Sequence, residues 1–214
     1  MTELKTEEEQ IEAFKTWWKK NGTTLILAVV VGVGGYFGFQ SWKQSEASHL
    51  ADASVLFQSM SDAAADLSDP NKVKTVSFIA DQLITEFDDT GYATFAHLYQ
   101  AKVSVVAEDY DAALAALNAA KESTDDVSLK SIADLRITKI LLTTGLFDDA
   151  LTQVELVNLI EFDAQKYEMK GDILLAQDNK AGARTAYQAA SDALVNSSIP
   201  TPLLDIKLQD LVEN

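Results

Sequence analysis

The sequence predicts an all-α protein in which a single N-terminal transmembrane helix is followed by a solenoid of helix pairs. Residues 21–42 form a strongly apolar run without a charged residue. Beyond Lys43 the chain contains three prolines and four glycines, with no Asn-Gly or Asp-Gly hairpin signal and no sustained apolar/polar alternation. Alanine and leucine dominate this part, and one pattern of aromatic and small residues recurs along it.

The apolar run has the length of a membrane span. As a helix, its 22 residues extend over ~33 Å, which matches a hydrocarbon layer of ~30 Å. Lys19 and Lys20 precede the run, and Lys43 follows it. Aromatic side chains, which favour the headgroup region, lie near its ends: Trp17, Trp18, Tyr36 and Trp42. The run therefore predicts a transmembrane helix at 21–42 that contacts the lipid bilayer.

Lysine counts predict the orientation of this helix. Four lysines precede it, whereas Lys43 alone follows it closely. Residues 1–20 are therefore expected to form a cytoplasmic tail, with the C-terminal domain exported. A cleaved signal peptide is the alternative, with Ser45 and Ala47 near a cleavage site. Such a peptide needs a short basic leader and an apolar stretch of about 7–15 residues, so the longer run and acidic leader favour an uncleaved signal anchor.

The tail carries signals for a short amphipathic helix at the inner membrane interface. Thr6 and Glu9 match a capping box. Apolar side chains then recur at helical spacing: Ile11, Phe14, Trp17 and Trp18. A frayed tail with an aromatic anchor explains the same residues equally well.

Small residues recur four apart within the span. Ala28 and Gly32 form one such pair, and Gly34 and Gly38 form another. This spacing is typical of transmembrane helices that pack closely against a partner helix. The alternative is that glycine is simply common in membrane helices.

Turn and capping residues divide the exported domain. Asp69-Pro70 predicts an N-cap and a first helical residue, residues 88–91 separate two helices, and Gly145 ends another. The predicted helices are 46–67, 71–88, 91–108, 110–122, 126–144, 147–159, 162–177, 180–194 and 203–212. They group into a membrane-proximal pair at 43–90, repeats at 91–194 and a C-terminal capping helix within 195–214.

The repeats follow a period close to that of tetratricopeptide repeats. Ala113, Ala150 and Ala183 occupy the same place in an aromatic/alanine/large/small pattern and lie 37 and 33 residues apart. A tetratricopeptide repeat has about 34 residues. The preceding helices agree in part: Gly171 takes the glycine place of the last repeat, where Ala101 and Thr138 stand in the others. A generic alanine-rich bundle is the alternative.

No catalytic, cofactor or metal-binding pattern is found. The chain has no cysteine, and its two histidines, His49 and His97, lie far apart. His97 falls at a packing position of the repeat. The part of the chain after the span contains 28 acidic and 13 basic residues, and this negative net charge opposes binding to nucleic acid. A non-enzymatic binding protein without a cofactor is therefore expected.

The first helices of the repeats are expected to line a concave face that binds a partner. Lys102 and Lys139 are equivalent in successive repeats and are expected to face one groove. The groove would be mixed apolar and basic and would suit a peptide or a partner loop. Its predicted residues are Phe95, Leu98, Lys102, Ile132, Leu135, Lys139, Leu142, Gln165, Glu168 and Asp172. In the alternative, the helices of 46–88 fold back and fill the groove as core.

The whole arrangement resembles the ancillary SecYEG translocon subunit family of bacterial inner membranes. The resemblance is carried by short segments along essentially the full chain: 9–13, Trp17-Trp18, Asn21-Gly22, 32–34, Trp42, 170–172 and 182–184. The segment 54–90 matches in helical character only.

This resemblance implies a function that composition does not reveal. Members of the family associate with the SecYEG channel and with a membrane-anchored periplasmic chaperone related to prolyl isomerases, and they help pass exported polypeptides to folding factors. For this chain the resemblance implies an inner-membrane adaptor whose C-terminal domain lies in the periplasm. The alternative is a regulator of envelope stress signalling that acts through its cytoplasmic tail.

Overall fold

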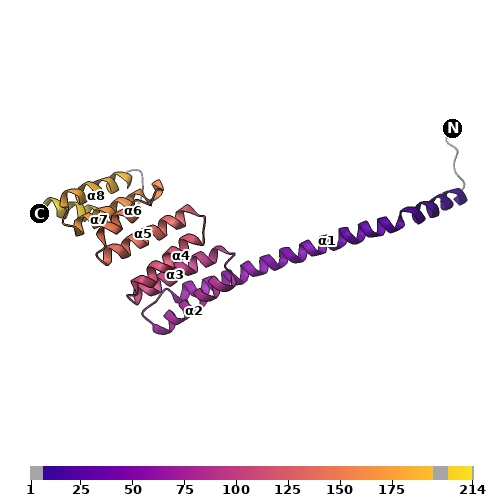
Figure 1. The fold of residues 1–214 in the computed structure, drawn as a ribbon, viewed down its shortest axis with the longest axis horizontal. Coiled ribbons are helices and arrows are strands. Elements are labelled where there is room, and N and C mark those ends of the chain that lie inside the picture. Colours follow the sequence, from indigo (N-terminus) through magenta and orange to yellow (C-terminus); the bar gives the residue numbers. More distant parts are fainter. Residues whose placement is uncertain (1–6, 195–201, 214) are drawn as a thin grey trace. The chain divides into compact units, whose positions relative to one another are not determined.

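The computed structural model describes residues 7–194 and 202–213, and these residues form helices and short connections without a strand (Figure 1). Thr6 of the predicted capping box and residues 195–201 of the C-terminal segment lie outside the described residues. The chain divides into two compact units, Met1–Asp52 and Ala53–Asn214. The predicted all-α class is confirmed.

Helix α1 (Glu7–Ala63) accounts for the described part of the first unit. It contains the apolar run, whose side chains are almost entirely exposed within the chain, so the run is not a core helix. By length and composition this helix is a candidate membrane span. The helix predicted to begin at residue 46 is instead a continuation of α1, because no glycine or proline interrupts residues 39–63.

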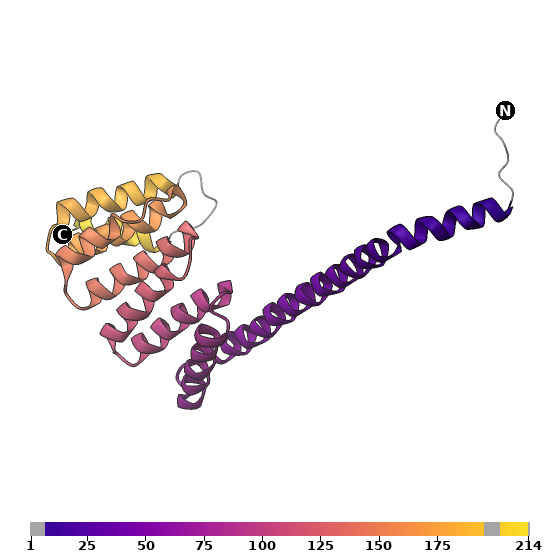
Figure 2. The same cartoon turned by 45° about the vertical axis from the view of Figure 1, so that its right-hand side comes forward.

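The second unit stacks its helices in chain order, each packed against the next (Figure 2). They are α2 (Pro70–Glu86), α3 (Gly91–Val106), α4 (Tyr110–Glu122), α5 (Val127–Thr143), α6 (Phe147–Val154), α7 (Asp163–Ala176), α8 (Lys180–Leu194) and α9 (Pro202–Glu213). A 3₁₀ turn, Ile160–Phe162, precedes α7. Helix α6 ends earlier than the predicted 159, and Val157 beyond it is still fully buried.

The first helix of each repeat ends in the same backbone motif. At Gly145, the amide of Leu146 donates to the carbonyl of Leu141 at 2.9 Å, and the amide of Gly145 donates to that of Leu142. Gly145 has a φ of 79°, as a Schellman motif requires. Glu108 and Asp178 repeat this geometry with φ values of 58° and 60°. The three left-handed residues are thus spaced as the three alanines are, 37 and 33 apart.

Small residues bring the two helices of a repeat together. Ala113, Ala150 and Ala183 are each completely buried. In the last repeat, a Cβ added at Gly171 would overlap the ring of Tyr187, so only glycine fits there. The equivalent pairs are Ala101 with Leu117 and Thr138 with Val154, so a larger residue on the first helix accompanies a smaller one on the second.

Gly171→Ala is expected to destabilise the domain by about 1–3 kcal/mol, because the new methyl group overpacks a filled contact. Urea unfolding followed by circular dichroism measures this loss. Tyr187→Leu in the same chain recreates the Ala101–Leu117 combination of the first repeat. The double variant should therefore lose less than the sum of the two single variants, and strict additivity would contradict this account of the contact.

Candidate functional site

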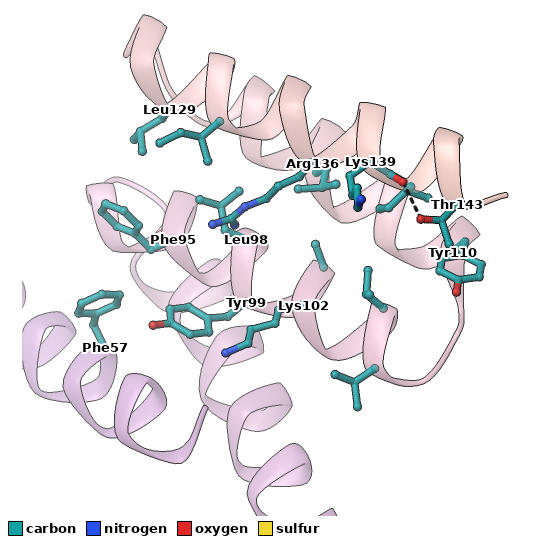
Figure 3. A pocket seen from close by; sticks show the side chains of 16 residues that line it. Phe57, Phe95, Leu98, Tyr99, Lys102, Tyr110, Leu129, Arg136, Lys139 and Thr143 are labelled. Atoms are coloured by element: carbon teal, nitrogen blue, oxygen red, sulfur yellow. Dashed lines mark hydrogen bonds between the residues drawn. The ribbon is translucent and has the colours of Figure 1, made fainter. Parts of the chain in front are cut away.

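A hollow of about 740 Å³ opens between α3 and α5 (Figure 3). These are the first helices of adjacent repeats, and the last turns of α1 reach the hollow through Phe57. Helix α4 contributes Tyr110 and Leu117. The volume of the hollow lies within the usual range of ligand pockets, about 300–1,000 Å³.

The repeat places equivalent positions of α3 and α5 on the same hollow. Four lining pairs are 37 residues apart, which is the spacing of the first two repeat alanines: Phe95 with Ile132, Tyr99 with Arg136, Lys102 with Lys139, and Val106 with Thr143. Because both helices expose the same face, their side chains converge from the two sides of the hollow.

Aromatic side chains close one end of the hollow. The ring of Phe57 lies 5.3 Å from that of Tyr92, 5.5 Å from that of Phe95 and 6.2 Å from that of Tyr99, measured between centroids. These are contact distances for aromatic pairs. From residues 46–88, the side chain of Phe57 covers this end of the hollow. The rest of the hollow is not filled by this segment and stays open.

Lys102 combines a structural role with its place in the hollow. Its ammonium donates a hydrogen bond of 2.9 Å to the carbonyl of Ala64, just beyond the end of α1. A cation is favourable at a helix C-terminus because it meets the negative end of the helix dipole. Lys102 therefore fixes the end of α1 against α3, and no sequence motif predicts this contact.

Arg136 and Lys139 bring positive charge into the hollow from α5 (Figure 3). No ion pair or hydrogen bond of either side chain is present among the residues that the structure describes. Burial lowers the pKa of Arg136, an effect that Tyr99 opposes, and the guanidinium stays charged at neutral pH. Among the described residues that line the hollow, three are cationic and none is acidic.

The predicted groove residues divide into two sets. Those that line the hollow are Phe95, Leu98, Lys102, Ile132 and Lys139. Those that do not line it are Leu135, Leu142, Gln165, Glu168 and Asp172. Leu142 packs with the core between α6 and α7, and Gln165 is exposed. The hollow thus lies between the first two repeats.

Helix α9 packs against the last repeat, and its Lys207 pairs with Glu168 and Asp172. The ammonium of Lys207 on α9 lies 2.7 Å from a carboxylate oxygen of each residue. Burial opposes the charge of Lys207, but hydrogen bonds with the two carboxylates raise its pKa. Tyr187 donates a hydrogen bond of 2.7 Å to Asp172, and burial followed by that contact raises the pKa of Tyr187. Leu204 is buried beside this cluster, so α9 caps the solenoid.

The small residues of the span make no packing contact within the described chain. A Cβ added at Gly32, Gly34 or Gly38 would meet no heavy atom within 4 Å, and Ala28 is exposed. Substituting these residues would therefore not disturb the protein's own packing.

Several lining residues were not predicted from the sequence. Arg136, Tyr99, Phe57 and Tyr110 belong to the hollow alongside the predicted set. Arg136 could have been predicted from the sequence. It lies one helical turn before Lys139, on the same face of the helix, and it is 37 residues after Tyr99, at the equivalent repeat position. Phe57 could not be found this way, since it comes from a helix outside the repeats.

The described residues contain no group of three or more His, Cys, Asp or Glu side chains that could hold a metal ion. His97 is half-buried on α3, and its Nδ1 atom is buried without a hydrogen-bond partner among the described residues. Burial lowers the pKa of His97, while a hydrogen bond with Gln100 opposes the shift.

Because the folded state disfavours the protonated form of His97, its contribution to stability is present above the ordinary histidine pKa of about 6.5 and is lost as the pH falls toward the lower folded value. His97→Gln should therefore flatten the dependence of unfolding free energy on pH below about 6.5. Urea titrations at several pH values measure this, with His49→Gln as the control. An unchanged slope in His97→Gln would contradict the assignment.

Comparison with known proteins extends these observations to the whole chain. Residues 15–213 match the family model of a tetratricopeptide repeat-like domain. The chain is 32% identical to the ancillary SecYEG translocon subunit of Haemophilus influenzae over 96% of this chain and 97% of that protein. It is 27% identical to the protein of the same name from Escherichia coli K12, over 97% of this chain and 96% of that protein. No solved structure matches.

Full-length similarity, the tetratricopeptide-like repeats and the single apolar N-terminal helix agree with one another. The chain belongs to the ancillary SecYEG translocon subunit family, whose fold is a tetratricopeptide repeat-like domain.

Proposed function

We propose that this protein is a non-enzymatic adaptor of the bacterial inner membrane that associates with the SecYEG translocon. The supporting observation is the full-length match to translocon subunits, with one candidate span and an open hollow in the repeat domain. Tetratricopeptide repeats bind partners on a concave surface and need no catalytic group. The mechanism is binding alone: the span associates with the channel, and the repeat domain holds a second partner.

The cytoplasmic tail comprises residues 1–20 in this proposal, and the repeat domain lies in the periplasm. The lysines on the N-terminal side of the span support this orientation. Absence of cysteine is compatible with an oxidising compartment. The domain would then meet polypeptides as they leave the channel.

The span would associate laterally through its small residues. Ala28, Gly32, Gly34 and Gly38 have no packing role inside the described chain, so their surface is available to a neighbouring transmembrane helix. Close approach of two helix backbones at such positions allows dispersion contacts that lipid chains do not supply.

The repeat domain would scaffold a membrane-anchored periplasmic chaperone of the prolyl-isomerase type and assist the handover of exported polypeptides. The hollow between α3 and α5 is the proposed contact surface, with Phe95, Leu98, Lys102, Ile132 and Lys139 in it. Leu135, Gln165, Glu168 and Asp172 were expected on the same face, and the proposed contact surface does not include them.

The role of the span is tested by copurification. In Gly34→Leu/Gly38→Leu the helix stays apolar, but two bulky side chains block close approach. Recovery of channel subunits with the full-length protein in mild detergent should fall about fivefold or more. The matched control is Val29→Leu/Val33→Leu, which adds bulk to a different face at about 100° per residue.

Equal recovery of the channel with both variants would contradict lateral association through the glycines. Recovery of only cytoplasmic regulatory proteins with the unmodified chain would contradict the adaptor function and favour a regulator that acts through residues 1–20.

A further inference from the structure

The charge of the hollow is opposite to that of the protein. The chain carries 33 acidic and 17 basic residues. Lys102, Arg136 and Lys139 are nevertheless gathered in the hollow, and no acidic residue lines it among the described residues. An apolar surface with unneutralised cations attracts a ligand that brings both apolar groups and negative charge.

The cations lie among apolar and aromatic side chains in the hollow. Arg136 and Lys139 project from α5, with the guanidinium of Arg136 directed toward Leu98, while Phe57 and Phe95 lie at one end and Tyr110 lies at the other (Figure 3). Lys102 already donates to the carbonyl of Ala64, so its charge is partly engaged. Arg136 and Lys139 are therefore the two lining cations whose side chains make no hydrogen bond among the described residues, so all their donors are available to a ligand.

These features favour a polypeptide over a lipid surface. An anionic bilayer would have to approach a domain whose 28 acidic residues exceed its 13 basic ones, and it would be repelled before its headgroups reached the hollow. A short polypeptide segment enters a hollow of about 740 Å³ without bringing a charged surface with it. Its carboxylates can meet a guanidinium and an ammonium while its apolar side chains displace water from the aromatic end.

We propose that the hollow between α3 and α5 binds an acidic segment of a partner protein, with carboxylates at Arg136 and Lys139 and apolar side chains against Phe95, Leu98 and Ile132. This inference rests on the proposed adaptor function and names the chemistry of its partner. Arg136 acts in it as a determinant of specificity, because a basic or uncharged segment of the same shape leaves the two cations unpaired.

The test uses a fluorescein-labelled amphipathic peptide of about sixteen residues, with leucine at helical spacing and glutamate on the adjoining positions. Its isostere carries glutamine in place of every glutamate. Fluorescence anisotropy measures the binding of each to the full-length protein in phosphatidylcholine nanodiscs, with empty nanodiscs as a blank. The acidic peptide should bind, and the glutamine peptide should bind at least about tenfold more weakly.

Arg136→Gln/Lys139→Gln should weaken binding of the acidic peptide about tenfold, because two charge-assisted contacts are lost while the apolar stems remain. The matched control is Lys180→Gln/Arg184→Gln, which removes the same two residue types from exposed positions on α8. Both pairs change the net charge equally, so long-range electrostatics cannot explain a difference between them.

Equal binding of both peptides, equal binding by both variants, or no binding of the acidic peptide would overturn the inference. Displacement of the peptide by phosphatidylglycerol vesicles would also overturn it. So would sedimentation measurements in which the protein self-associates and the self-associated form does not bind the peptide. Copurification of the channel with the unmodified protein separates the two proposals. If the channel is recovered with it while the unmodified protein does not bind the acidic peptide, the partner chemistry is wrong and translocon association stands.

Discussion

Close contact between the two helices of each repeat is the constraint on which the rest of the domain depends. The contact is made by a small residue on one helix and a larger one on the other, with Gly171 and Tyr187 as its extreme case. Helices that approach this closely bury one face against each other, and the face beyond that contact is left to pack on a neighbouring repeat or to meet a ligand. Overpacking at Gly171 therefore changes more than a local contact, since helix α9 docks beside the same tyrosine.

The hollow follows from this arrangement and from what covers the two ends of the solenoid. Phe57 closes the end formed by the first repeat, and Lys207 binds carboxylates in the last one. The surface between α3 and α5 contains a cavity, and this cavity holds Arg136 and Lys139 in a protein of net charge −16. The side chains of Arg136 and Lys139 make no hydrogen bond or ion pair among the described residues, so these two charges can be changed without removing such a contact between helices, whereas Lys102 also holds the end of α1.

Periodic features of this chain could be predicted from sequence, and contacts between distant segments could not. The buried alanines, the Schellman motif at Gly145 and the apolar run all come from local patterns, and the structure contains them. The contact of Lys207 with Glu168 joins residues 39 apart that share no repeat position, so the sequence could not show that Glu168 binds α9. Continuity of α1 was also missed, because the change from apolar to polar composition near Trp42 does not itself break a helix.

The central claim is that the repeat domain, with its hollow, lies on the side of the membrane where exported polypeptides emerge. Because the chain has no cysteine, single cysteines report on topology without background. Glu8→Cys and Asp149→Cys place one thiol in the tail and one in the domain, both at exposed positions. In intact spheroplasts, a membrane-impermeant maleimide should label Asp149→Cys at once and Glu8→Cys only after permeabilisation. The reverse pattern would place the hollow in the cytoplasm and contradict the adaptor function.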